Sequence, residues 1–299
     1  MSPGRWFAAV LATPVLLLVP PAQVAPAAVS LLEVESSTAV DFGDGTVHVL
    51  ALGSDSTGAD PRRGNADAIE LISLNFETGA ASALGIPRDT LVELDGAGEQ
   101  KINAGLPVGG TDLMVKEVEQ VTGVEIQYVV TAGGDDFEEL VNTVGGLEVH
   151  SDVAFEDPAY ELEVHPGPNS LNGRQARGFA KSRDFEGGDF TRMANQQLLL
   201  RAILEEVRGQ ADELGFIESG SLSALQHLDT NLSPEDLYRF AQAIGQVDPT
   251  LTTSCVLTGP TEDRVVGDET ENVVLLDPAY VVRVAQDAAD GVLEGSCAP

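Results

Sequence analysis

The chain has 299 residues and a formal net charge of −32, from 16 Lys and Arg against 48 Asp and Glu. Hydrophobic residues make up 43% of it and charged residues 21%, a balance typical of globular proteins and not of disordered ones. Proteins that bind nucleic acid in general present dense Lys and Arg surfaces to the phosphate backbone, so this composition argues for no nucleic-acid partner.

The first 28 residues have the order of a secretory signal. Arg5 is their only charge, an apolar stretch over residues 6–19 follows, and the small residues Ala25-Pro26-Ala27 end it. The apolar stretch is interrupted by a proline and is shorter than the ~20 residues that a spanning helix needs. We expect either cleavage after Ala27 or retention as an N-terminal membrane anchor, with residues 29–44 as a short linker. Both alternatives place the chain outside the cytoplasm, in the cell envelope.

Hydrophobic patterning after the linker alternates between strands and helices. It predicts strands over residues 47–52, 69–76, 81–86, 126–130, 147–149, 251–257 and 273–276. It predicts helices over residues 111–121, 135–144, 171–181 and 190–207, and two more that begin at Ser233-Pro234 and Asp277-Pro278. We therefore expect an α/β fold, layered α-β-α around a central mixed β-sheet, as one domain over residues 45–290 followed by a tail over 291–299.

The chain has two cysteines, Cys255 and Cys297. An even count in an oxidising compartment predicts one disulfide, which would pin the C-terminal tail to the strand around Val256. Two unpaired thiols are the alternative. The four histidines are scattered and follow no zinc-ligand spacing.

Basic residues gather in one window. Residues 170–208 hold seven of them and five acids, a local charge of +2 in an acidic chain; the seven are Arg174, Arg177, Lys181, Arg183, Arg192, Arg201 and Arg208. Guanidinium groups match phosphate oxygens, which favours a phosphate site. Pairing with surface acids is the alternative, and spacing alone supports the two equally.

Other charged residues stand at predicted strand ends, where α/β proteins place ligand-binding groups. Arg88 and Asp89 follow the strand that ends at Pro87, and Lys101 lies in an acidic, glycine-rich stretch. Asp55 follows one predicted strand and Asp67 precedes the next. If these strands are neighbours, the two carboxylates could share Mg²⁺, which prefers oxygen ligands and often bridges protein to phosphates.

Taken in order, these segments resemble one family. The segments are Gly53-Ser54-Asp55, Asp67, Ile86-Pro87-Arg88-Asp89-Thr90, Lys101-Ile102-Asn103, Gly145-Gly146-Leu147-Glu148-Val149, Gly167-Pro168, Leu171-Asn172-Gly173-Arg174-Gln175-Ala176, Lys181-Ser182-Arg183, Asp189-Phe190-Thr191-Arg192 and Gln196-Gln197. Their order and spacing are similar to those of the LytR-CpsA-Psr family. The resemblance is strong over residues 45–210 and looser to residue 290.

The resemblance implies an extracytoplasmic phosphotransferase at the outer face of the cytoplasmic membrane. Such an enzyme moves a glycopolymer from a polyprenyl-phosphate or pyrophosphate carrier to peptidoglycan and forms a phosphodiester. Carried over by position, Asp55 and Asp67 would bind Mg²⁺ or Mn²⁺. The phosphates would be held by Arg88, Lys101, Lys181, Arg183, Arg192 and Gln196. The catalytic set would be Asp67, Arg88, Asp89 and Arg183, with Asp89 orienting Arg88 or accepting a proton.

The same resemblance implies an apolar tunnel for the lipid tail. Its candidate lining residues are Leu113, Val118, Phe137, Leu140 and Leu198 to Leu200, and ordinary core is the alternative for each.

Three positions depart from the family pattern. The chain has Asn65-Ala66-Asp67-Ala68 where the family has Arg-Ser-Asp-Thr, Lys181 where it has the first Arg of Arg-x-Arg, and Asn195 where an Arg precedes the paired glutamines. Arg62 or Arg63 could substitute for the first missing Arg. The departures leave an alternative function open: a non-catalytic envelope protein that binds polyprenyl phosphate or a polyanion. A third function, transcription attenuation, is disfavoured by the export signal and the charge of −32.

Overall fold

The computed structural model of the chain describes residues 45–56, 60–183, 188–295 and 297. The predicted export segment (1–28) and linker (29–44) lie outside these residues. Among the residues that the structure describes, no helix is both long and apolar enough to cross a bilayer.

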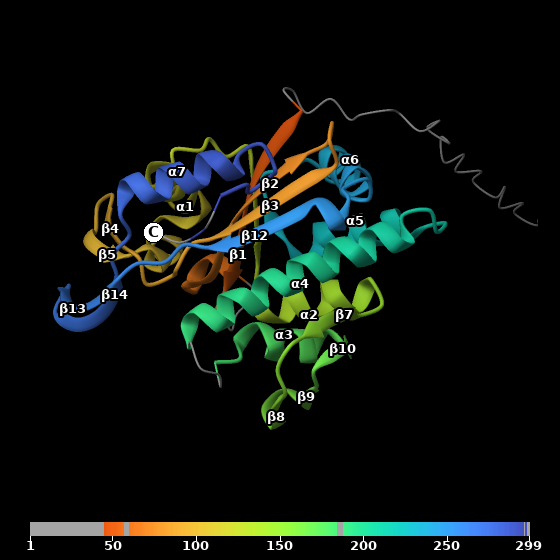
Figure 1. Cartoon of the computed structure of the whole chain (residues 1–299), viewed down its shortest axis with the longest axis horizontal. Helices are drawn as coiled ribbons and strands as arrows, with labels where there is room; N and C mark the ends of the chain where they lie inside the picture. Colours follow the sequence, from red (N-terminus) through yellow and green to blue (C-terminus); the bar gives the residue numbers. More distant parts are fainter. Residues whose placement is uncertain (1–44, 57–59, 184–187, 296, 298–299) are drawn as a thin grey trace, which may run out of the picture. The chain divides into compact units, whose positions relative to one another are not determined.

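A six-stranded mixed sheet forms the centre of the domain (Figure 1). Its strand order is β11-β6-β1-β2-β3-β12, with bounds Asp229–Thr230, Tyr128–Ala132, Thr46–Ser54, Ala66–Asn75, Ala80–Gly85 and Thr252–Val256. The hairpin β1-β2-β3 is antiparallel, whereas β6 and β12 join it in parallel on either side and β11 pairs antiparallel with β6. The predicted mixed sheet is confirmed.

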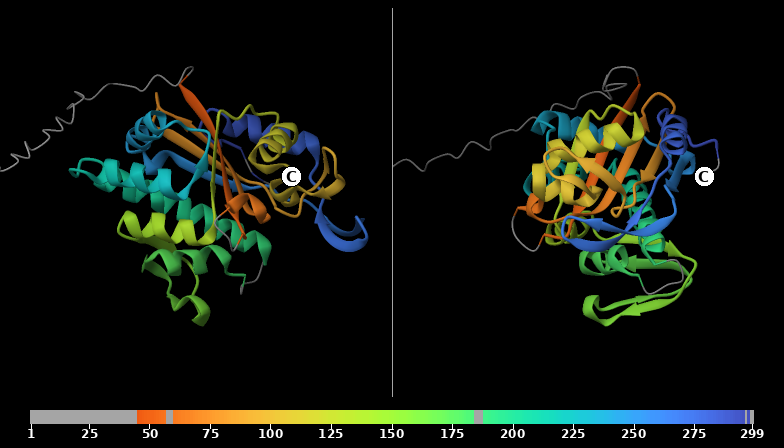
Figure 2. Two further views of the ribbon diagram at one scale, coloured as in Figure 1. Left: turned by 180° about the vertical axis from the view of Figure 1, so that it is seen from behind. Right: turned by 90° about the vertical axis from the view of Figure 1, so that its left-hand side faces the viewer.

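Side-chain alternation along the strands gives the sheet two buried faces. In β1, Leu50 and Leu52 pack with α1 (Gly105–Thr122) and α7 (Pro278–Ala288). Val47 and Val49 point the other way and pack with α4 (Asp189–Gln210) and α6 (Pro234–Ile244). Helices therefore cover both faces, as Figures 1 and 2 show, and the α-β-α layering is confirmed.

A second core lies beyond α4. It is formed by α2 (Gly134–Thr143), α3 (Gly173–Lys181) and α4 with β7 (Leu147–Ser151), β9 (Leu162–Val164) and β10 (Gly167–Leu171). Strand β9 pairs with β8 (Phe155–Asp157), and α5 (Phe216–His227) precedes β11. The candidate tunnel residues divide between cores: Val118 belongs to the α1–α7 core, and Phe137, Leu198 and Leu199 belong to this one. These four side chains are packed in core clusters on opposite sides of the sheet.

Two hairpins extend from the α1–α7 side of the domain. One is β4 (Leu91–Leu94) with β5 (Gly98–Lys101), and the other is β13 (Thr261–Val266) with β14 (Glu269–Val274). The base of the second is tied to the loop after β3, because the Val274 N–H donates to the Asp89 carbonyl at 2.8 Å. This tie brings β14 beside the residues that follow β3.

Most predicted helices and strands are present, with shifted ends. The helix predicted over 171–181 begins at Gly173, because residues 167–171 form a strand paired with β7 and Asn172 caps the helix. The strand predicted over 273–276 is the end of β14. Ser233 and Asp277 accept hydrogen bonds from the N–H groups of Asp236 and Tyr280, which confirms both predicted helix starts.

The structure pairs the two cysteines, and this pair joins the C-terminal tail to the sheet. Cys255 on β12 and Cys297 form a disulfide, with their Cα atoms 5.9 Å apart. Tyr280 of α7 donates to the Cys297 carbonyl, so the tail crosses the end of that helix.

Candidate functional site

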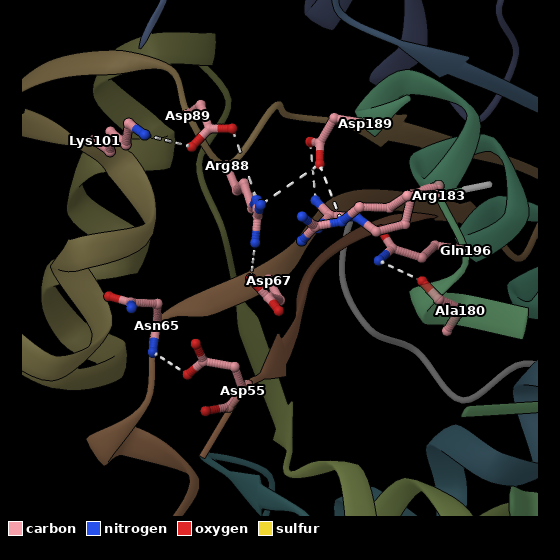
Figure 3. Close-up of polar contacts among 12 residues, drawn as sticks. Asp55, Asn65, Asp67, Arg88, Asp89, Lys101, Ala180, Arg183, Asp189 and Gln196 are labelled. Carbon is pink, nitrogen blue, oxygen red and sulfur yellow. Dashed lines mark hydrogen bonds and ion pairs between the residues drawn. The ribbon is translucent and has the colours of Figure 1, made fainter. Parts of the chain in front are cut away.

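Charged side chains converge where β1 ends, β2 begins and the loop leaves β3 (Figure 3). The end of α3 and the start of α4 complete this region with Arg183 and Asp189. We call it the strand-end site. It brings together most of the residues predicted from the sequence.

Asp55 directly follows β1, and Asp67 belongs to β2, which pairs with β1; the two strands are therefore neighbours, the condition on which the predicted aspartate pair depended. Ser54 of β1 pairs with Ala66 and Gly53 pairs with Ala68, so Asp67 is the extra residue of a β-bulge and lies inside β2, not before it. Asp55 Oδ1 accepts a hydrogen bond from the Asn65 N–H at 2.7 Å.

Gly64 permits the close approach of chain segments around Asp55. A Cβ at this position would lie 2.4 Å from Asp55 Oδ1 and 2.3 Å from the Ser56 nitrogen. Any other residue here would push the Asp55 loop away from β2.

Asp55 and Asp67 form the candidate metal site. Each carboxylate uses one oxygen within the site: Asp55 Oδ1 accepts from the Asn65 N–H, and Asp67 Oδ1 accepts from Arg88. Mg²⁺ is commonly held by one or two carboxylates with the remaining positions filled by water and phosphate oxygens. The donor set fits this pattern. The described residues contain no group of three or more His, Cys, Asp or Glu suited to a metal ion.

Arg88 lies at the centre of the site. Its guanidinium bonds to the Asp67 carboxylate and forms ion pairs with Asp89 (Nε to Oδ2, 3.8 Å) and Asp189 (Nη2 to Oδ1, 3.7 Å). Burial opposes the charge on Arg88, but the adjacent carboxylates, Asp67 first, outweigh it and raise its pKa. Arg88 is therefore held as a fixed cation between three elements.

Asp189 joins three arginines and was absent from the predicted site residues. Besides Arg88, its carboxylate pairs with Arg192 at 2.9 Å and with Arg183 at 4.0 Å. The residue lies in the motif Asp189-Phe190-Thr191-Arg192, where an acid three residues before an Arg on a helix predicts an ion pair. That spacing was the signal that could have identified it.

Arg192 is the most buried cation of the site, with 2% of its side chain exposed. Burial first, and the nearby Arg88 second, lower its pKa. Among the residues that the structure describes, its Nε and Nη1 have no hydrogen-bond partner, and neither does Arg88 Nε. Buried N–H groups are nearly always paired in folded proteins, so these donors point to an anion or water that occupies the site.

Lys101 lies at the other end of the site, on β5. Its Nζ is 3.0 Å from Asp89 Oδ1 and 2.7 Å from Glu271 Oε2 of β14. Burial opposes its charge, and hydrogen bonds to Glu271 and Asp89 outweigh burial and raise its pKa. Asp89 thus bridges Lys101 and Arg88.

Gln196 contacts the end of α3. Its Nε2 donates to the Ala180 carbonyl at 3.3 Å, and the amide of Asn195 donates to the Phe179 carbonyl at 3.4 Å. The two amides satisfy free carbonyls of the last turn of α3, directly before Lys181 and Arg183. Gln196 Oε1 is buried and has no hydrogen-bond partner among the described residues. Lys181 is exposed and forms no ion pair with a described residue.

The basic residues of 170–208 divide between the two predicted alternatives, a phosphate site and pairing elsewhere. Arg183 and Arg192 face Asp189 in the site. The other arginines bond elsewhere: Arg174 to a carbonyl at residue 159, Arg177 to Asp135 and Glu138, Arg201 to Glu205, and Arg208 to carbonyls at residues 246 and 247. Arg62 and Arg63, considered as substitutes for a missing Arg, are largely exposed and pair with Asp60, and Arg62 also with Asp229.

One protein family matches most of the chain. The family model described as the LytR_cpsA_psr family matches residues 25–278. A relative from Bacillus anthracis, named polyisoprenyl-teichoic acid–peptidoglycan teichoic acid transferase TagU, is 31% identical over 195 residues, which are 64% of this chain and 62% of TagU. TagV of Bacillus subtilis, with the corresponding name, is 29% identical over 204 residues, or 64% of this chain and 51% of TagV. The matches therefore span about half to three fifths of these relatives.

Two solved structures share the fold of this chain. The crystal structure of B. subtilis TagV superimposes with a TM-score of 0.71 at 25% identity, covering 83% of this chain and 98% of that structure. The Lin1025 protein from Listeria innocua superimposes with a TM-score of 0.67 at 26% identity, covering 85% of this chain and all of that structure.

Proposed function

Since the chain belongs to the LytR-CpsA-Psr family, we propose that it is an extracytoplasmic phosphotransferase that moves a glycopolymer from a polyprenyl-pyrophosphate carrier to peptidoglycan. The names of TagU and TagV support this class of reaction. One observation in this chain carries the proposal: Arg88, Arg183 and Arg192 converge on one carboxylate, while buried N–H groups of Arg88 and Arg192 have no hydrogen-bond partner among the described residues. Such donors suit the oxygens of a pyrophosphate.

The reaction requires little covalent chemistry from the protein. An acceptor hydroxyl attacks the phosphorus that bears the glycopolymer, a new P–O bond forms, and the bond to the bridging oxygen of the pyrophosphate breaks. The hydroxyl proton is released and polyprenyl phosphate leaves. Catalysis of such a step depends on positioning and on stabilising charge that develops on phosphate oxygens.

The site residues have distinct roles in this scheme. Arg192 and Arg183 would bind the phosphates from the α3–α4 side, and Arg88 would bind them from the sheet. Asp89 contacts both Arg88 and Lys101, which supports an orienting role for it. Gln196 would act by holding the end of α3, which precedes Arg183.

Asp55 and Asp67 would hold Mg²⁺ or Mn²⁺. When bound, the cation would neutralise charge on the pyrophosphate. Figure 3 shows the Asp67 side chain between that of Asp55 and the guanidinium of Arg88, which would place the cation beside a phosphate bound by Arg88.

A second candidate function is a non-catalytic binder of polyprenyl phosphate. The position of Lys181 favours it, because this residue replaces an Arg of the family pattern and pairs with no described residue. In this case the carrier would bind without transfer.

A transfer assay with a lipid-linked donor and peptidoglycan tests the proposal. The wild-type protein should form product, and Asp67→Ala or Arg183→Ala should abolish it. Arg201→Ala is the matched control, because Arg201 is a half-exposed α4 arginine paired with Glu205 outside the site. Carrier that co-purifies and is detected by mass spectrometry, without any transfer by wild-type protein, would favour the binder. Absence of both would contradict both functions.

A further inference from the structure

The β13–β14 hairpin contributes a carboxylate to the strand-end site. Glu271 Oε2 of β14 lies 2.7 Å from Lys101 Nζ, closer than Asp89 Oδ1 at 3.0 Å. Two carboxylates from separate elements therefore share one ammonium group. Sequence motifs give no indication of this contact, because Lys101 and Glu271 are 170 positions apart.

The contact is fixed by the backbone of the hairpin. The Val274 N–H donates to the Asp89 carbonyl at 2.8 Å, and Thr90 forms a β-bridge with Val274. Glu271 is three residues before Val274 on the same strand. The strand that carries Glu271 is thus attached to the loop that carries Arg88 and Asp89.

The cation of the hairpin itself, Arg264, does not neutralise Glu271. Arg264 pairs with Glu271 in the strand register, but its guanidinium bonds to Glu262. The ion pair of Glu271 is with Lys101.

The two carboxylates on Lys101 differ in how firmly they are held. Asp89 also pairs with Arg88, and its side chain is 25% exposed. Glu271 is 36% exposed at the rim and can turn toward solvent. An anion that approaches Lys101 would therefore displace Glu271 before Asp89.

We propose that Glu271 is an affinity-determining residue that competes with the phosphate group of the substrate for Lys101. The inference rests on the proposed function, in which Lys101 binds a phosphate of the carrier. When a phosphate binds at this end of the site, one of its oxygens replaces the Glu271 carboxylate on Lys101. The contribution of Lys101 to the free energy of binding is therefore reduced. The same exchange returns Glu271 to Lys101 when the phosphate leaves, and favours release of the product.

Binding of inorganic pyrophosphate, measured by calorimetry at constant ionic strength, tests this role. Glu271→Gln should bind pyrophosphate about three- to tenfold more tightly than wild type, the order expected for neutralising one competing carboxylate near the surface. Glu269→Gln is the matched control: it removes the same charge two residues away on β14, where the side chain is exposed, and should change affinity by less than about twofold. Glu271→Ala should give the same gain as Glu271→Gln.

A double-mutant cycle assigns the effect to Lys101. Lys101→Met should weaken pyrophosphate binding, and Glu271→Gln should add nothing in the Lys101→Met background. Should Lys101→Met fail to fold, the gain of Glu271→Gln over Glu269→Gln should still shrink as salt is raised.

The outcomes separate the two proposals. Unchanged or weaker binding by Glu271→Gln, or a gain that persists with Lys101→Met, would overturn the role of Glu271 and leave the transferase proposal standing. If wild type and all variants bind no pyrophosphate, the phosphate site itself is wrong and the inference fails with it.

Discussion

Gln197 on α4 and Glu70 on β2 are joined in the interior beneath the strand-end site. The amide Nε2 of Gln197 donates to Glu70 Oε2 at 3.3 Å and to the Cys255 carbonyl at 2.6 Å. Within the described part of the chain, Glu70 Oε1 has no hydrogen-bond partner. One polar network therefore connects β2, β12 and the helix that carries Arg192.

This pair predicts a dependence of stability on pH. Burial raises the pKa of Glu70 to about 8, against a smaller lowering by the Gln197 hydrogen bond. The folded state therefore holds a proton that the unfolded chain releases near pH 4.5, and the free energy of unfolding should fall as pH rises between these values. The full shift corresponds to roughly 5 kcal/mol.

Glu70→Gln should flatten this slope, since an amide has no charge to lose. Chemical unfolding between pH 5 and pH 9 measures it, and the variant should exceed wild type in stability above pH 8. Glu77→Gln, at the turn after β2, is the control and should keep the wild-type slope. A wild-type slope in Glu70→Gln would mean that other groups cause it.

Glu70 also illustrates what the sequence could and could not predict. Strands β1, β2 and β3 follow from hydrophobic alternation, and Asp55 and Asp67 were identified from predicted strand ends, although Asp67 lies in a bulge within β2. Glu70 interrupts the alternation of β2 as a fully buried acid, and only the three-dimensional contact with Gln197 explains it.

The missing parts of the site come from long-range contacts. Asp189 belongs to the motif Asp189-Phe190-Thr191-Arg192, but its contacts with three arginines form only where α3, α4 and the loop after β3 meet. Glu271 lies on the β13–β14 hairpin. Most residues of these two strands are exposed, so their sequence pattern gives only a weak indication of a strand. Local periodicity carries no information about such contacts.

Asp189 should hold the site together when no phosphate is bound. Asp189→Asn leaves the buried Arg192 without its nearest counter-charge, and we expect a loss of about 2 to 3 kcal/mol of unfolding free energy. Added pyrophosphate should restore most of this loss by replacing the carboxylate. Thermal unfolding with and without pyrophosphate measures both effects.

The control for this variant is Glu205→Gln, which removes the partner of Arg201 on the exposed part of the same helix. It should change stability by less than about 0.5 kcal/mol. Equal stability of Asp189→Asn and wild type without ligand would contradict the structural role of Asp189.

Gln196 should affect stability as well as binding. Gln196→Ala removes the donor to the Ala180 carbonyl at the end of α3 and should cost about 1 kcal/mol in the ligand-free protein. Pyrophosphate affinity should fall too, because Arg183 follows that end of the helix. If Gln196 acted only as a direct phosphate ligand, Gln196→Ala would lower pyrophosphate affinity and leave the stability of the unliganded protein unchanged. Denaturant unfolding and calorimetry together therefore separate the two roles. Asn195→Ala, which removes the neighbouring amide donor to α3, should show the same loss of stability.

The disulfide between Cys255 and Cys297 should stabilise the end of the domain that bears β12. The two cysteines are 42 positions apart, and closing a loop of that length is expected to contribute about 4 kcal/mol through the unfolded state. Denaturant unfolding with and without reductant should show this difference in the wild-type protein. The double variant Cys255→Ser with Cys297→Ser should be as unstable as the reduced wild type and insensitive to reductant. Free thiols at both positions in a non-reducing peptide map of exported protein would contradict the pairing. If the map shows the bond and reductant has no effect on unfolding, the tail contributes nothing to the stability of the sheet, and the packing of α7 alone holds that end of the domain.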